Sequence, residues 1–532
     1  MSLAAPSSPD GRFRIIAILG VLVFVVLAFA AWSAGVRAIE QTTEDAFGCD
    51  GFGYLRQARL FQQDGWVGGL NTAMRDPVTV ALVDIATATG RPHVQWDEAV
   101  APHCHHYVPS TRQVILQYPP GTGWLMSFFP EGRQVRGMSV AVILTLLACF
   151  AVRLAGATTR LAVVATAVLG LFSFLTLYSF DMFWSIVPTA LCMTVMGYLC
   201  ASVFTDDRPS PLFMHAAFGL AAGLAVNFRT ANVFLIAGLI PAYGIRLASP
   251  GVKRGLAEGI CFGCGVILGL VPILAAQAIN TGSPFTTTYS AADASMPSFG
   301  SIELVRGLRF YFVEEWQCGV LLVAAVAFLQ VGNWLYFRNR LHAGLVLLAV
   351  AIELIFNVGY FLLRPIREAY YVAPVAMFAV AATAAALEAA GGEAATGRQA
   401  HRVRWLTGAI FVALWIPVAV QLSGRLSTAG LSHFANPVSS PTIEPDAVVW
   451  ADLSSGTFYY YLHRQAAKLA SAGPSMRDEL VSAVAASGRP QYLVLDSANM
   501  KADSVALARD FDVRPVGSVF GSDILRIAPR PR

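Results

Sequence analysis

Long apolar runs recur along the chain, and they constrain its fold more than any other feature. A run of about 17–25 apolar residues is long enough to cross the hydrocarbon core of a bilayer as a helix. Of the 532 residues only 13% are charged, whereas about 25% is typical of soluble domains. The sequence therefore predicts a mainly α-helical, polytopic membrane protein. Its net charge of +4, without a long basic run, argues against a nucleic-acid partner.

The apolar runs predict about eleven membrane spans. Their approximate positions are 15–34, 137–155, 161–179, 183–204, 211–226, 231–247, 257–279, 317–336, 341–363, 369–389 and 403–422. The fifth and sixth are short and flank a polar stretch at 227–232. The first span exports the segment that follows it, whether or not it is cleaved.

Lysine and arginine are distributed unevenly between the short loops, which sets the expected orientation. A cytoplasmic N-terminus puts most of them inside: Arg12, Arg14, Arg153, Arg160, Arg208, Arg246, Lys253, Arg254, Arg338, Arg340, Arg398, Arg402 and Arg404. The short outer loops keep Arg229, Arg364 and Arg367. By the positive-inside rule the N-terminus is cytoplasmic, and eleven spans put the C-terminus outside. This pattern favours a bacterial inner membrane, although an endoplasmic reticulum protein would show the same one.

Two domains are expected from this arrangement. Residues 1–424 form the membrane domain, which includes the long outer loop 35–136, and residues 425–532 form a small extracytoplasmic α/β domain. In the tail the fraction of charged residues rises, and short apolar runs alternate with amphipathic stretches. The expected strands lie within 447–452, 491–497 and 518–528, and the expected helices at 456–470 and 476–487. The tail has no GxGxxG or P-loop motif, so we assign it no nucleotide.

Carboxylates and arginines gather on the predicted outer face, where cytosolic ATP and nucleotide sugars are absent. A group transfer there needs an activated donor that arrives within the membrane, and a lipid-linked phosphosugar meets that need. Arginine suits its phosphate, and a carboxylate suits the proton of an acceptor hydroxyl. Asp50 and the outer arginines Arg229, Arg364 and Arg367 are the matching groups. The same groups also suit a transporter.

Five stretches, taken in order, resemble the motifs of a known superfamily. They are CDGFGYLRQARLF (49–61), QYPPGTGWLMSFF (117–129), GLAVNFRTANVFL (223–235), NTGSPFTTTYS (280–290) and REAYYVAPVAMF (367–378). Together they are similar to the GT-C superfamily of polytopic glycosyltransferases, in the branch of protein O-mannosyltransferases and aminoarabinose lipid A transferases. The resemblance covers nearly the whole chain. It departs from the family at Gly51, where the family has a second acidic residue.

The resemblance implies an inverting transfer of a sugar from a polyprenyl-phosphate donor to a hydroxyl on a glycan, lipid or protein acceptor. Asp50 would be the catalytic base, Glu44 or Asp45 could supply a second acid, and the three outer arginines would hold the donor phosphate. The candidate substrate-binding residues are Tyr54, Tyr118, Tyr289 and Tyr370. Some members of the wider superfamily use a divalent metal and others do not, so we assign no cofactor and leave a metal open.

Simpler interpretations stand beside these roles. Asp50 could cap a helix at 51–63, because aspartate is a favoured N-cap residue. The cluster HCHHY suggests metal ligands at His103, His105 and His106, but adjacent histidines cannot all point at one ion. Cys49 and Cys104 are candidates for a disulfide in an oxidising compartment.

Two other functions remain open at this point. A transporter or flippase for a lipid-linked or envelope substrate predicts polar residues deep inside the spans and an internal repeat. The sequence shows few such residues and no repeat. A non-catalytic protein of envelope assembly predicts that Asp50 is dispensable.

Overall fold

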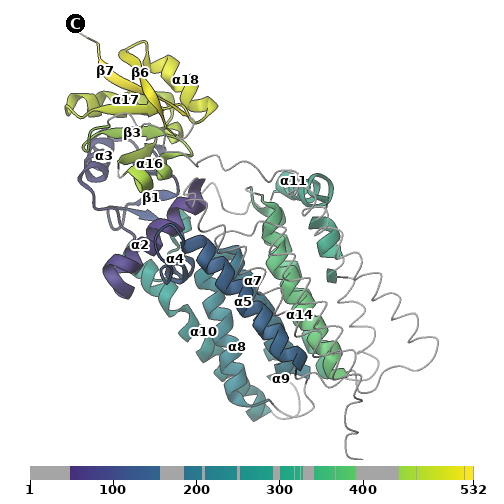
Figure 1. Cartoon of the computed structure of the whole chain (residues 1–532). Helices are drawn as coiled ribbons and strands as arrows, with labels where there is room; N and C mark the ends of the chain where they lie inside the picture. The colour runs from purple at the N-terminus through teal and green to yellow at the C-terminus, as the bar shows by residue number, and fades with distance from the viewer. Residues whose placement is uncertain are drawn as a thin grey trace, which may run out of the picture. The chain divides into compact units, whose positions relative to one another are not determined.

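The computed structural model is mainly helical, and Figure 1 shows it as a ribbon. It describes residues 48–155, 185–205, 210–247, 252–291, 300–316, 318–323, 325–326, 341–365, 367–390, 443–462, 464–519 and 522–530. The chain divides into two compact units. We call residues 137–271 and 295–429, together with 1–38, the helical unit, and residues 39–136, 272–294 and 430–532 the mixed unit.

The described part of the helical unit contains long apolar helices and short helical turns. Its described elements are α5 (Gln134–Ala155), α7 (Ile186–Thr205), α8 (Leu212–Phe228), η2 (Thr230–Asn232), α9 (Val233–Leu247), α10 (Val252–Thr281, whose last turns belong to the mixed unit), α11 (Ser301–Arg309), the π-helical turn η5 (Phe310–Glu314), α13 (Leu341–Leu363), η6 (Ala369–Val372) and α14 (Ala373–Ala390). Helices thus occupy seven of the predicted spans, although α5 and α10 begin earlier than expected. The predicted spans at 15–34, 161–179 and 403–422, and most of 317–336, lie outside the described residues.

Three stretches of described helix are long and apolar enough to cross a membrane, namely Ile186–Phe204, Thr230–Leu247 and Val252–Thr281. Shorter apolar helices include Leu212–Phe228 and Leu348–Leu363. Length and composition alone support these assignments, which agree with a polytopic membrane protein.

Helices α8 and α10 approach each other closely through glycines. A Cβ atom at Gly219 would lie 2.0 Å from the carbonyl oxygen of Phe262, and one at Gly223 would lie 2.4 Å from that of Val266. Gly265 on α10 meets the α8 backbone in the same way. Small residues allow such close packing between membrane helices, where apolar burial gives little driving force.

The mixed unit combines the segment after the first predicted span with the tail. Its elements are α2 (Gly48–Leu70), α3 (Pro77–Ala88), η1 (His93–Gln95), β1 (His105–Val108), β2 (Gln113–Leu116), α4 (Pro120–Met126), η3 (Thr288–Ala291), β3 (Val448–Ala451), α16 (Ser455–Leu462), β4 (Gln465–Lys468), η8 (Leu469–Ser471), α17 (Pro474–Ala486), β5 (Gln491–Val494), α18 (Ala498–Leu507), β6 (Phe511–Val519) and β7 (Ser522–Pro529). Strands β1 and β2 form an antiparallel hairpin.

The tail forms a five-stranded sheet in the order β4-β3-β5-β7-β6. Strand β3 runs parallel to β4 and β5, whereas β7 is antiparallel to its neighbours β5 and β6. The expected helix at 456–470 was wrong in its second half, because α16 ends at Leu462 and β4 follows. Ala466 and Ala467 pair with β3 and are fully buried. Tertiary pairing therefore outweighs the helix propensity of these alanines.

The segment 39–136 and the tail share one hydrophobic core. Leu82 on α3 and Trp96 belong to the same buried cluster as Trp450 on β3 and Leu480 on α17. The apolar face of α3 packs on the tail sheet and α17, and both parts belong to the mixed unit. The domain boundary expected at 424 stays a prediction.

Polar contacts join the same two parts of the mixed unit. The Arg91 Nε donates to Glu479 at 3.0 Å, and the Lys468 backbone N–H donates to the Ala101 carbonyl at 2.9 Å. The Lys468 ammonium also lies 3.2 Å from Glu98. Tail and loop are thus joined by backbone, side-chain and apolar contacts.

Candidate functional site

Asp50 lies in the first turn of α2 and is half-buried. The helix begins at Gly48, so Asp50 does not take the N-cap position that a helix at 51–63 would have given it. Its carboxylate instead accepts a hydrogen bond from the Tyr118 hydroxyl, which belongs to the segment just before α4. The structure thus joins two residues that the sequence analysis singled out separately.

Tyr118 lies at the centre of a group of tyrosines. Its ring centroid is 4.5 Å from that of Tyr54 and 6.2 Å from that of Tyr289. The ring also fills the space above Gly53, where a Cβ atom would lie 2.6 Å from it. Burial and the neighbouring charge of Asp50 raise the pKa of Tyr118 well above its ordinary value. The phenol therefore stays protonated and serves as a donor.

Arg56 lies six residues after Asp50 on α2 and is buried. Its side chain bonds to neighbouring segments and so fixes the position of the helix. The Arg56 guanidinium donates to the carbonyl oxygens of Thr72 at 2.9 Å and Ala73 at 3.4 Å, and its Nη1 lies 3.5 Å from His105 Nε2. The backbone N–H of Thr72 in turn donates to the Asn280 side chain at 2.9 Å. This buried network ties α2 to the end of α10.

The tail packs directly on the start of α2. A Cβ atom at Gly456 of α16 would lie 2.5 Å from the Phe52 ring. The Phe52 ring centroid also lies 5.5 Å from that of Tyr459 and 5.2 Å from that of His105. Because Phe52 is two residues from Asp50, α16 helps to fix the position of this carboxylate.

The three candidate metal-binding histidines do not converge on one point. His105 and His106 are adjacent in β1, so their side chains point to opposite faces. His106 Nε2 lies 2.8 Å from Gln117 Oε1, and His105 Nδ1 lies 3.3 Å from the His103 carbonyl oxygen. Among the described residues, no three His, Cys, Asp or Glu side chains are grouped as metal ligands.

Burial keeps two of these histidines neutral. It lowers the pKa of His103 to about 4, and it lowers that of His105 well below its ordinary value. For His105 the adjacent Arg56 charge acts in the same direction. Both side chains therefore belong to the interior of the mixed unit.

The remaining candidates are the two cysteines of the predicted disulfide, Tyr370, and the two acidic residues that precede Asp50. Cys104 is disulfide-bonded, whereas Cys149, Cys192, Cys200, Cys261 and Cys264 are free cysteines. The side chain of its predicted partner Cys49 lies outside those that the structure describes. The same holds for the Tyr370 side chain and for the whole of Glu44 and Asp45.

Arg229 and Arg364, in the helical unit, both approach the ring of Tyr371. Arg229 directly follows α8 in extended conformation, and its guanidinium carbon lies 4.1 Å from the Tyr371 ring centroid. The corresponding distance from Arg364 is 5.1 Å. The Phe361 ring stacks on Tyr371 with a centroid distance of 5.1 Å. Two cations thus share one aromatic platform, which the sequence analysis did not identify.

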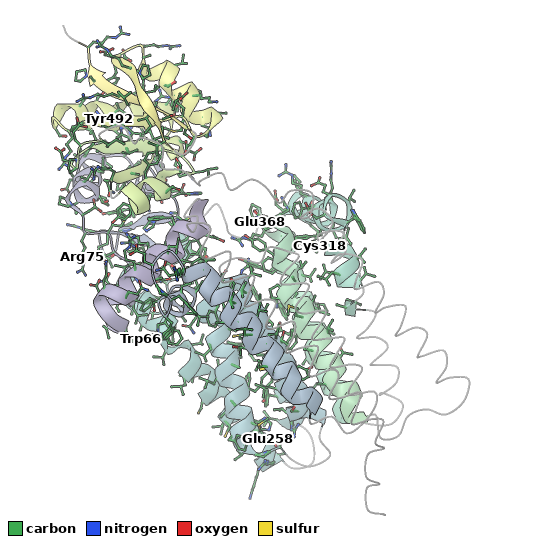
Figure 2. All side chains as sticks on the ribbon, viewed as in Figure 1. Trp66, Arg75, Glu258, Cys318, Glu368 and Tyr492 are labelled. Atoms are coloured by element: carbon green, nitrogen blue, oxygen red, sulfur yellow. The ribbon has the colours of Figure 1, made fainter. Side chains whose placement is uncertain are left out.

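Arg367 has a different environment from the other two arginines. It forms an ion pair with Glu303 on α11, and its Nη1 donates to the Pro365 carbonyl at 3.2 Å. Nearby, the Tyr311 hydroxyl donates to the Glu368 carbonyl at 3.2 Å. Figure 2 labels Glu368, which lies at the opposite end of the helical unit from Glu258. Sequence reasoning missed Glu303, because no local spacing links α11 to residue 367.

The candidate residues therefore form two groups. Asp50, Tyr118 and their neighbours belong to the mixed unit, whereas the arginines around Tyr371 belong to the helical unit. The first group supplies a carboxylate with an oriented donor, and the second supplies positive charge on an aromatic support.

A comparison with solved structures finds a protein whose fold this chain shares. The chain is similar to the crystal structure of ArnT from Cupriavidus metallidurans in the apo state, with a TM-score of 0.54 and 14% sequence identity. The alignment covers 95% of this chain and 97% of that chain. No protein-family model and no curated protein sequence matches the chain. The identity is low, so the likeness establishes the fold alone.

Proposed function

We propose that the protein is an integral membrane glycosyltransferase that uses a polyprenyl-phosphate sugar as donor and an acceptor hydroxyl on the outer face of the membrane. The observation that carries this proposal is the likeness to ArnT over almost the whole length of both chains. The hydrogen bond from Tyr118 to Asp50 and the two arginines over Tyr371 support it at the level of individual residues.

In the proposed reaction Asp50 is the base. The acceptor oxygen attacks the anomeric carbon of the sugar and the bond to the polyprenyl phosphate breaks, which inverts the configuration. The hydroxyl proton passes to the Asp50 carboxylate. Tyr118, which stays protonated, orients this carboxylate by donating to one of its oxygens. Glu44 and Asp45 remain candidates for an additional acid.

Arg229 and Arg364 are the proposed partners of the donor phosphate. Planar guanidinium groups match phosphate oxygens in pairs, and the Tyr371 ring supports both. The ion pair with Glu303 makes Arg367 a structural residue in this proposal. Tyr54 and Tyr289 pack against Tyr118. In this proposal they either contact the substrate next to Tyr118 or act on it indirectly, by holding the Tyr118 ring in place.

The proposed setting is a bacterial inner membrane, with the N-terminus in the cytoplasm and the mixed unit in the periplasm. The uneven distribution of lysine and arginine between loops supports this orientation. A polyprenyl-phosphate donor also fits an outer face, because it reaches the site through the bilayer. The acceptor is a glycan, a lipid or a protein.

Sugar transfer by the purified full-length protein tests the proposal. The assay would offer a panel of polyprenyl-phosphate sugars with mixed acceptors and measure the polyprenyl phosphate released. Asp50→Asn would be compared with Asp64→Asn, which changes an exposed carboxylate on the same helix. We expect Asp50→Asn to abolish transfer and Asp64→Asn to retain it.

Two other outcomes are informative. Full transfer by Asp50→Asn would leave the protein an enzyme but move the base to Glu44 or Asp45. No transfer by the wild-type protein from any donor, with the protein folded, would contradict the enzyme class. A transporter or an envelope assembly protein would then be the better description.

A further inference from the structure

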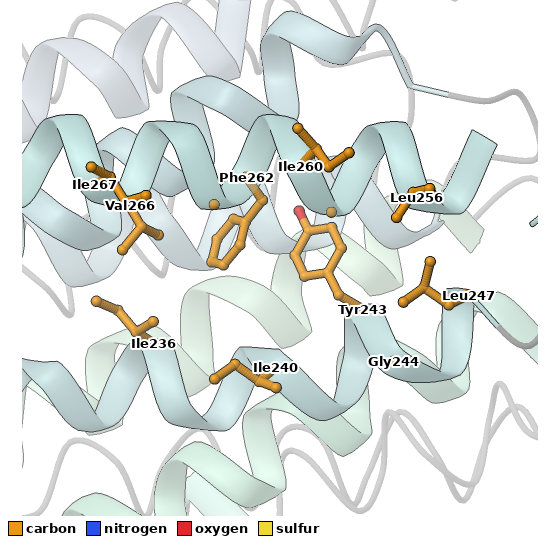
Figure 3. Close-up of a pocket in the computed structure, with 12 residues that line it drawn as sticks. Ile236, Ile240, Tyr243, Gly244, Leu247, Leu256, Ile260, Phe262, Val266 and Ile267 are labelled. Atoms are coloured by element: carbon orange, nitrogen blue, oxygen red, sulfur yellow. The ribbon is translucent and has the colours of Figure 1, made fainter. Parts of the chain in front are cut away.

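An apolar groove runs between α9 and α10 in the helical unit, as Figure 3 shows. Its volume is about 510 Å³. The walls come from aliphatic and aromatic side chains, such as Ile236 and Ile240 on α9 and Ile260 and Ile267 on α10. The hydroxyl of Tyr243 is the one polar side-chain group among its lining residues. Such a groove accepts a hydrocarbon chain.

Glycines create the hollow. Gly244 on α9 and Gly259 and Gly263 on α10 line the groove, and a Cβ atom at any of them would meet no described atom within 4 Å. The glycines between α8 and α10 show the opposite situation, because at Gly219 a Cβ atom would collide with backbone. On α10, Gly265 therefore faces the α8 backbone, whereas Gly259 and Gly263 leave the groove open.

The length of the groove fits one leaflet of a bilayer. Along α10 its lining residues extend from Leu256 to Ile267. At 1.5 Å per helical residue this stretch is about 16 Å long, which is roughly half the thickness of the hydrocarbon core. The occupant that matches this length is one acyl chain of a lipid in a single leaflet.

Positive charge is concentrated at one end of the groove. Arg246 lies in the last turn of α9 beside the lining residue Leu247, and Lys253 and Arg254 lie in the first turn of α10 just before Leu256. The buried carboxylate of Glu258 lies 2.5 Å from Arg246 Nε and 3.0 Å from Arg254 Nε.

Among the described residues named here, one carboxylate accompanies three cations, so this set carries surplus positive charge. Lys253 is exposed, and the Arg254 side chain is 43% exposed. Arg254 also donates to the Ser210 carbonyl. The exposed part of its guanidinium and the Lys253 ammonium can contact an anion at the surface while the pair between Arg246 and Glu258 stays in place.

We propose that this groove binds one acidic phospholipid. An acyl chain lies along Gly259 and Gly263, and the lipid phosphate contacts Arg254 and Lys253. Basic clusters between membrane helices on the cytoplasmic side attract acidic headgroups, and the orientation expected from the sequence puts this end in the cytoplasm. The site is separate from the proposed donor site, because Glu258 and Glu368 mark opposite ends of the helical unit in Figure 2.

Lipid retention by the full-length protein tests the proposal. The protein would be reconstituted with equal amounts of phosphatidylglycerol and phosphatidylcholine, and native mass spectrometry would measure the lipid that stays bound. We expect wild type to prefer phosphatidylglycerol. Arg254→Gln should lower that preference by about fivefold, because one basic residue near a membrane surface contributes about 1 kcal/mol.

A second variant fills the groove itself. Gly259→Leu combined with Gly263→Leu should abolish retention of the bound lipid. Gly359→Leu is the matched control, because a Cβ atom at this α13 glycine also meets no described atom within 4 Å and the residue lies outside the groove. It should leave retention unchanged.

The proposal would be overturned by unchanged phosphatidylglycerol retention in the filled variant, or by a wild-type protein that does not distinguish the two lipids. Should the filled variant fail to fold, Arg254→Gln still decides the question, because its side chain is partly exposed. A copurified polyprenyl phosphate in the groove, in place of phospholipid, would also contradict it.

Discussion

The Tyr118 hydroxyl donates a hydrogen bond to the Asp50 carboxylate, across 68 positions of the sequence. Tyr118 is buried among Tyr54, Tyr289 and the backbone at Gly53, so its direction is fixed. An oriented carboxylate is what a base needs if it is to meet the acceptor proton in one geometry. This relationship gives the first prediction.

Tyr118→Phe should lower kcat with little change in KM for the donor. The variant removes a hydrogen bond to a charged group, which contributes about 1.5–3 kcal/mol, equivalent to about a 10- to 150-fold change in rate. Steady-state kinetics on the full-length protein would measure the two constants separately. A rise in KM at constant kcat would instead assign Tyr118 to substrate binding.

Tyr107→Phe is the matched control for this prediction. Tyr107 lies in β1, is buried, and packs against Trp96 with a centroid distance of 4.9 Å. The substitution also removes one hydroxyl from the mixed unit. Equal losses of kcat in both variants would show that the effect of Tyr118→Phe is a general loss of packing.

Tyr371→Leu should weaken donor binding. The ring lies within 4.1 Å of the Arg229 guanidinium and also supports Arg364. Loss of cation–π contacts of about 0.5–2 kcal/mol corresponds to a roughly 2- to 30-fold rise in the donor dissociation constant. Titration with a labelled polyprenyl-phosphate sugar would measure it.

Arg367→Gln is the contrasting variant. Arg367 pairs with Glu303, whereas the Tyr371 ring contacts that we assign to phosphate come from Arg229 and Arg364. We expect the donor affinity of Arg367→Gln to stay within about twofold of wild type. If Arg367→Gln lowered donor affinity as much as Arg229→Gln, we would assign Arg367 to the phosphate site as well.

Gly456→Ala should destabilise the mixed unit and lower transfer together. The added Cβ atom would lie 2.5 Å from the Phe52 ring, so α16 or α2 has to move. Overpacking of this kind costs about 1–3 kcal/mol, and the start of α2 carries Asp50. Thermal melting followed by tryptophan fluorescence, together with kcat, would measure both effects.

Gly473→Ala provides the comparison for Gly456→Ala. Gly473 is also in the tail, has an ordinary extended backbone, and offers open space to a Cβ atom. We expect its melting temperature and activity to match wild type. Similar losses in both variants would contradict a specific role for the contact between α16 and Phe52.

Acid should destabilise the protein between about pH 6.5 and pH 4. His103 has its pKa lowered to about 4 by burial, whereas the unfolded residue binds its proton near pH 6.5. The unfolded state thus binds more protons in this range, so stability is complete above it and falls as the pH falls. His105, with its pKa also lowered, adds to the slope.

Melting temperatures measured from pH 7.5 to pH 4.5 would test this. His103→Gln should reduce the pH dependence by about one proton. A pH profile that His103→Gln does not alter would show that this histidine is not the group responsible.

Much of the membrane part could be predicted from the sequence, because a bilayer requires long apolar helices. The expected spans at 183–204, 231–247 and 341–363 fall on α7, α9 and α13 within a few residues. In the tail, β3 and β5 coincide with the expected runs. Strand β4 was missed because the sequence QAAK has no strand signal of its own; pairing with β3 determines its conformation.

The candidate site residues were chosen from the sequence and stay predictions, whereas the contacts between them come from the structure. Asp50, Tyr118 and Arg229 lie in the family-like motifs, and Arg364 was chosen as an arginine of a predicted outer loop. The hydrogen bond from Tyr118 to Asp50 and the ion pair between Arg367 and Glu303 join residues 68 and 64 positions apart. Periodicity and spacing describe near neighbours, so they cannot specify such pairs.

The core shared by α3 and the tail sheet has a consequence for biosynthesis. Leu82 and Trp96 are made early, but Trp450 and Leu480, which bury them, are made after the helices of the membrane part. During translation the apolar face of α3 therefore stays without its packing partner until the tail has been made. In that interval it has to be kept from aggregating with other chains. The carboxylate of Asp50, whose helix α16 helps to position, would reach its final setting only as the last segment of the chain folds.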